Sequence, residues 1–122
     1  MSIVKDIIYL EWNEDGFWTN LPRRLVEHRS KTYEWGKVSD GSADLALNII
    51  HWALEQSEFA DRNWGVIECE KGEVSAFGYL MHEDYQRQVI ARIPQRGAQI
   101  RLQDVWDWIS KYPQPDFGES EE

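Results

Sequence analysis

The chain has 122 residues, a formal net charge of −9, one cysteine and seven tryptophans. This length suits a single domain, the lone thiol excludes an internal disulfide and a cysteine-rich zinc site, and the acidic charge disfavours general binding to nucleic-acid duplexes. The sequence has no apolar run near the roughly 20 residues of a membrane helix and no signal-peptide pattern at its N-terminus, so we expect a cytoplasmic protein without membrane contact.

The first part of the chain favours an antiparallel hairpin. Residues 7–12 are rich in the β-branched and aromatic side chains typical of strands. Residues 13–16, Asn-Glu-Asp-Gly, predict a turn, and residues 17–19 predict the returning strand. A polar and partly basic stretch at 23–31 follows, and residues 33–35 predict a short extended segment.

The middle of the chain predicts a buried helix. Residues 36–41 read as a loop, and Ser42 occupies the position of a helix N-cap, with Asp44 in the first turn. The helix predicted at 43–56 carries apolar residues around most of its circumference. We therefore expect it to lie at the centre of the fold.

The next segment predicts a hairpin and a second helix. Residues 57–63 form a polar connection, and the strands predicted at 64–70 and 73–77 flank a turn at Lys71-Gly72. Apolar residues spaced four apart predict a helix over 82–93.

The last part of the chain predicts a short extended piece at 98–102 and a third helix at 103–111. Residues 114–122 form an acidic tail that we expect to be disordered. The pattern as a whole predicts one α+β domain over 1–113, with a small, mainly antiparallel sheet packed on a buried central helix and two shorter helices.

The loop that enters the central helix is one candidate site, because free N–H groups at a helix N-terminus attract anions. Ordinary capping explains the same residues, and Asp40 places a negative charge where a phosphate would lie. Arginines, and no acids, occupy the stretch between Asp84 and Asp104 and could supply positive charge. The candidate residues of such an anion pocket are His28, Gly41, Ser42, Arg87, Arg92, Arg96 and Arg101, and the further candidate binding residues of this region are Glu34, Trp35 and Gly36.

Catalytic and metal-binding motifs are absent from the sequence. His28, His51 and His82 have no second histidine or cysteine three or four residues away, so we expect no metal site and no cofactor. A His28/Glu34 acid–base pair is the one catalytic arrangement that the segment offers. The absence of nucleophile, phosphate-loop and zinc-protease motifs favours a protein that is not an enzyme.

Aromatic residues near the C-terminus predict a contact surface. Trp106 and Trp108 are two residues apart and so point to different faces of the third helix. Tyr112 and Phe117 follow them, and the segment 55–73 and the tail are acidic. Tryptophan is enriched in binding hot spots.

Several short motifs of this chain resemble those of a known family. They are His28, Tyr33-Glu34-Trp35-Gly36, Ala43-Asp44-Leu45-Ala46-Leu47, Val89-Ile90-Ala91-Arg92-Ile93-Pro94 and Val105-Trp106-Asp107-Trp108-Ile109. Together they are similar to a small family of unknown function found in bacterial, phage and plasmid genomes. The likeness covers about two thirds of the chain, with residues 57–78 resembling an insertion and with fewer glycines in the loop. It implies a prokaryotic or mobile-element origin and no particular activity.

These observations lead us to expect a non-enzymatic, acidic protein-binding module, such as a phage or plasmid accessory protein or an inhibitor of a host system. The alternative is a domain that binds a small anionic ligand or a nucleotide through the loop and helix N-terminus at 36–44.

Overall fold

The computed structural model describes residues 6–56 and 65–113, and it confirms the predicted α+β class. The elements in chain order are β1 (Ile7–Asn13), β2 (Gly16–Thr19), α1 (Asp40–Glu55), β3 (Val66–Glu68), β4 (Glu73–Ser75), α2 (Ala76–Gln88), the 3₁₀ turn η2 (Ile90–Arg92), β5 (Gly97–Arg101) and α3 (Leu102–Lys111). The predicted connection at 57–63 and acidic tail at 114–122 lie outside the described residues. Within the described part of the chain, none of the helices combines the length and apolar character that a membrane crossing requires.

Two small antiparallel sheets organise the strands. The larger sheet has the order β2-β1-β5, so β1 lies in the middle and pairs with its neighbour in sequence and with a strand from the far end of the domain. The smaller sheet is the β3–β4 hairpin. Both predicted hairpins are therefore confirmed, although β3 and β4 are each shorter than the sequence predicts.

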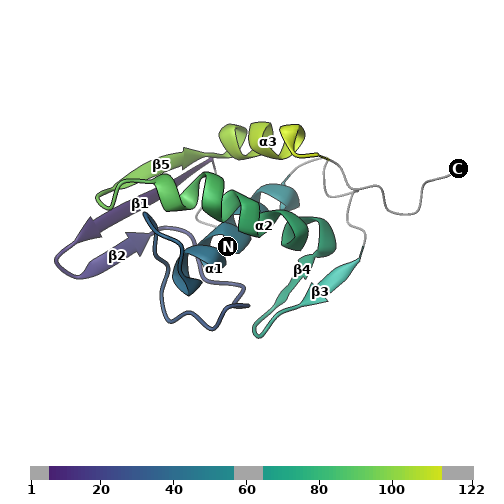
Figure 1. Cartoon of the computed structure of the whole chain (residues 1–122), viewed down its shortest axis with the longest axis horizontal. Helices are drawn as coiled ribbons and strands as arrows, with labels where there is room; N and C mark the ends of the chain where they lie inside the picture. Colours follow the sequence, from purple (N-terminus) through teal and green to yellow (C-terminus); the bar gives the residue numbers. More distant parts are fainter. Residues whose placement is uncertain (1–5, 57–64, 114–122) are drawn as a thin grey trace, which may run out of the picture.

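The core lies between one face of the larger sheet and the helices. Ile8, Leu10 and Ile100 are buried on that face. Helix α1 crosses the middle of the fold and contacts α2, η2 and α3 (Figure 1). Thirteen of its sixteen residues are buried, as the apolar pattern predicts. Most of the stability of a helix in a protein comes from tertiary packing, so this extensive burial stabilises α1.

The start of α1 differs from the prediction. Its N-cap is Ser39 and not Ser42, and the helix begins at Asp40, three residues earlier than expected. The Ser39 hydroxyl accepts a hydrogen bond from the Ser42 backbone N–H, and the Ser42 hydroxyl accepts one from the Ser39 N–H. This reciprocal capping box satisfies two groups at once and outweighs the single cap that Ser42 would supply.

Helix α2 also lies elsewhere than predicted. It spans 76–88 and not 82–93, because Ser75 ends β4 and its hydroxyl caps the helix at Gly78. Residues 90–92 form the separate 3₁₀ turn η2. The segment 33–35, predicted as extended, belongs to no strand, since Tyr33 and Trp35 are buried side chains of an irregular loop. Helix α3 matches its prediction within one residue.

Candidate functional site

Exposed aromatic side chains gather on the β1–β2 hairpin. Tyr9, Trp12 and Trp18 have exposed fractions of 38%, 46% and 49%. Trp18 lies opposite Glu11 in the register, and side chains alternate between the two faces of a strand, so Tyr9, Glu11 and Trp18 share the outer face of the sheet. Trp12 lies opposite Phe17 on the other face. The hairpin turn lies at one end of the long axis of the structure (Figure 1).

The charge of this hairpin has a single sign. From residue 6 to residue 22 the sequence contains four acids and no lysine or arginine. The four, all exposed, are Asp6, Glu11, Glu14 and Asp15. The turn itself is ordered by the Asn13 side chain, whose Oδ1 accepts a hydrogen bond from the Asp15 N–H at 2.8 Å. We call residues 7–19 the acidic aromatic hairpin. Two basic residues adjoin it: Arg101 lies opposite Ile7 at the end away from the turn, and the Arg96 carbonyl oxygen accepts a hydrogen bond from the Trp12 N–H at 3.3 Å.

The C-terminal tryptophans are more enclosed than those of the hairpin. Trp106 and Trp108 are both partly buried against the core. The Trp106 Nε1–H donates to the Ala53 carbonyl oxygen at 2.9 Å, and the Trp108 Nε1–H donates to Gln88 Oε1 at 3.0 Å. Phe117 lies outside the described residues. A groove of about 620 Å³ runs beside Trp108, lined by Leu80, Asp84, Gln88, Lys111, Tyr112 and Pro113.

Protein groups occupy the N-terminus of α1. Beyond the capping box, the Gln86 Nε2 donates to the Ser39 carbonyl oxygen at 3.0 Å and to Ser42 Oγ at 2.7 Å. Gly41 packs so tightly that a Cβ there would lie 2.6 Å from the Thr32 carbonyl oxygen. Gly41 and Ser42 are buried. The predicted anion site is thus filled by side chains and backbone of the protein itself.

The neighbouring candidates of the loop also have structural contacts. Trp35 is buried, and its Nε1–H donates to the Gln95 carbonyl oxygen at 2.9 Å. Gly36 has a φ of 82°, which favours glycine, and its N–H donates to Ile90 at 3.0 Å. Glu34 accepts a hydrogen bond from the Ser39 hydroxyl at 2.6 Å and lies 3.5 Å from the Lys37 ammonium.

The four candidate arginines are exposed and come from four places in the fold. Arg87 lies on α2, Arg92 in η2, Arg96 before β5, and Arg101 at the end of β5. Arg87 pairs with Glu83 and Asp84 on its own helix, at 3.9 and 3.6 Å. Exposed pairs of this kind contribute little stability.

His28 has a partner that the sequence did not indicate. Its Nε2 lies 2.9 Å from the Nε2 of His82, 54 residues away, while Glu34 bonds to Ser39. The buried carboxylate of Asp44 fixes the segment that carries His28, because it accepts hydrogen bonds from the backbone N–H groups of Glu27 and His28, both at 3.0 Å. An acid within a mainly apolar helix was the one signal that could have pointed to this role.

Comparison of the chain with protein-family models, with curated proteins and with solved structures found no match.

Proposed function

We propose that this protein binds another protein through the acidic aromatic hairpin, and that the partner presents a lysine- and arginine-rich surface. The observation that carries this proposal is the exposure of Tyr9 and Trp18 on the outer face of a segment whose charged groups are all acidic, with Trp12 exposed on the opposite face. Exposed aromatic side chains supply the anchors of protein interfaces. Charge of one sign around them favours encounter with a surface of the opposite sign.

The outer face of the hairpin has a suitable shape for such an anchor. Tyr9 and Trp18 lie diagonally across adjacent strands, at a separation where large side chains can contact each other, and Glu11 lies directly opposite Trp18. A basic side chain of a partner could therefore meet both a carboxylate and an aromatic ring, which attracts cations through its π face. The predicted resemblance to phage and plasmid proteins makes a bacterial host protein the first partner to test.

The test is a comparison of three tagged baits in nuclease-treated bacterial lysate, read by mass spectrometry. The baits are the unchanged chain, a hairpin variant (Glu11→Lys with Trp18→Ala) and a charge-matched control (Glu68→Gln with Glu70→Gln). Glu68 and Glu70 are exposed acids of the β3–β4 hairpin, which carries no exposed aromatic ring in its described residues. We expect one protein to be enriched by the unchanged and control baits and lost from the hairpin variant.

The captured protein is then titrated as a purified sample against the same variants. Affinity that falls at least about tenfold in the hairpin variant and falls with added salt supports a charged aromatic interface. Equal affinity of the hairpin variant and the unchanged chain would contradict the proposal. Loss of affinity in the Glu68/Glu70 control alone would move the interface to the acids of the predicted 55–73 segment.

A further inference from the structure

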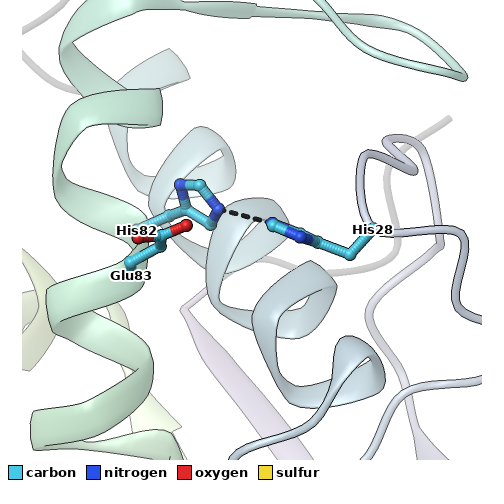
Figure 2. A group of neighbouring side chains, drawn as sticks. All are labelled: His28, His82 and Glu83. Carbon is cyan, nitrogen blue, oxygen red and sulfur yellow. Dashed lines mark hydrogen bonds between the residues drawn. The ribbon is translucent and has the colours of Figure 1, made fainter.

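Two histidines and one glutamate from distant parts of the chain meet beside α2. Among the described residues, His28, His82 and Glu83 form a group whose potential ligand atoms all lie within 4.8 Å of one another. Figure 2 shows the rings of His28 and His82 pointing toward each other, with the Glu83 side chain beside His82. Their Nε2 atoms are 2.9 Å apart.

The hydrogen bond on the far side of His82 determines which of its nitrogens is free. Nδ1 of His82 lies 2.6 Å from the Tyr79 carbonyl oxygen. A carbonyl oxygen can only accept, so Nδ1 carries the proton and Nε2 of the neutral ring carries a lone pair. That lone pair accepts a hydrogen bond from the Nε2–H of His28, so metal binding requires the His28 proton to move to its own Nδ1. Metal-binding histidines show this same arrangement, with one nitrogen bonded to a carbonyl and the other facing the metal.

We propose that His28, His82 and Glu83 bind a Zn²⁺ ion, with water completing its coordination. Two imidazoles and one carboxylate form a ligand set that zinc accepts, and leaving the fourth position to water is typical of zinc sites that are open to a substrate. Imidazole nitrogens select zinc and its transition-metal neighbours over magnesium and calcium, which prefer oxygen ligands.

The distances need only a small adjustment. Zinc–nitrogen bonds of about 2.0–2.1 Å at a tetrahedral angle place two nitrogens about 3.3 Å apart. The two Nε2 atoms are therefore too close by a few tenths of an ångström, and a small movement of the half-buried His28 ring would open the space. Glu83 is exposed on α2, so its carboxylate can turn from its 3.9 Å pair with Arg87 toward the metal.

The surroundings hold the segment that carries His28 in place. The Asp44 carboxylate holds the backbone of His28, and Ser30 adds a third N–H and a hydroxyl to its hydrogen bonds. These contacts limit the movement of the His28 segment and preorganise the site.

The test is isothermal titration of Zn²⁺ into the full chain after removal of any histidine tag. The variants are His28→Gln and Glu83→Gln, with His51→Gln as the matched control. His51 also forms a histidine–glutamate pair, with Glu55 at 3.2 Å, but lacks a second histidine. Because His28 and Glu83 are not fully buried, their replacement leaves the core intact.

We expect one Zn²⁺ per chain, affinity that falls about tenfold or more in His28→Gln, a smaller loss in Glu83→Gln, and no change in His51→Gln. Nitrogen NMR of the histidine rings adds a readout that is independent of folding differences, since zinc should shift the Nε2 signals of His28 and His82 together. Absence of zinc binding to the unchanged chain, or equal affinity in His28→Gln, would overturn the proposal.

Discussion

Replacing Asp44 by alanine tests how a carboxylate buried in the central helix supports the loop above it. The carboxylate accepts hydrogen bonds from three backbone N–H groups, those of Glu27, His28 and Ser30, at 3.0, 3.0 and 3.3 Å, and from the Ser30 hydroxyl at 2.6 Å. Its exposed fraction is 0%. The alanine variant leaves these donors without an acceptor in a largely enclosed place.

The size of the loss follows from the cost of an unpaired donor. A buried donor without an acceptor costs about 1–3 kcal/mol. Residues 27, 28 and 30 are only partly buried, so water reaches some of these groups. We therefore expect Asp44→Ala to lower the free energy of unfolding by about 3–5 kcal/mol, a large share of the 5–15 kcal/mol typical of a domain.

Urea unfolding followed by tryptophan fluorescence measures this loss, compared at equal m values. Asp40→Asn is the control, because Asp40 lies in the first turn of the same helix but is exposed. It should cost less than about 1 kcal/mol, the usual contribution of a charge at a helix end. A loss below about 1 kcal/mol in Asp44→Ala would refute the view that this carboxylate fixes the loop.

Three further predictions concern a glycine, two histidines and the cysteine. Gly97→Ala places a Cβ 1.8 Å from a backbone oxygen of β1, at a φ of 115°. Urea unfolding should therefore show a larger loss of unfolding free energy than for Gly16→Ala, where φ is 107° but the surrounding space is open. Equal losses in the two variants would contradict this. Burial lowers the pKa of His82 and of His51, so the unfolded chain binds protons that the folded chain does not. Stability is therefore complete above the ordinary pKa of 6.5 and falls as the pH drops below it, a slope that glutamine at either position should flatten in melting curves. Burial, and to a smaller extent the neighbouring Glu27 carboxylate, raise the pKa of Cys69 to about 11. Alkylation of this thiol at pH 8 should therefore be about 100-fold slower than for a thiol with a pKa near 9. An alkylation rate equal to that of the urea-unfolded chain would disprove this prediction.

The sequence predicted well those elements that are specified by neighbouring residues in the chain. The turn at 13–16 and its flanking strands, and the terminal helix α3, follow their residue patterns closely. The early start of α2 was not predicted, because Phe77 resembles a strand residue and Gly78 resembles the residue that ends a strand. Gly78 weakens a helix, yet it allows α2 to approach α1, since a Cβ there would lie 3.0 Å from the Leu54 side chain. Packing between the two helices therefore overrides local preference.

The candidate sites depend on contacts that sequence spacing does not encode. His28 and His82 are joined only after α1 and α2 pack together, so neither residue has a nearby partner in the sequence. The tryptophans show the same limit. Trp35 and Trp18 both lie in short aromatic stretches, but the first is buried at 1% exposure and the second is 49% exposed. The packing of the irregular loop at 33–35 buries Trp35, whereas the register of β2 exposes Trp18, and sequence spacing encodes neither.

The middle position of β1 has a consequence for biosynthesis. β1 emerges from the ribosome before any other described element. The larger sheet is complete only after residues 97–101 have been made and have paired with residues 7–11. Until then Ile8 and Leu10 belong to a two-stranded hairpin, which is marginally stable in water. Nascent chains arrested before residue 97 should therefore be readily cut by proteases.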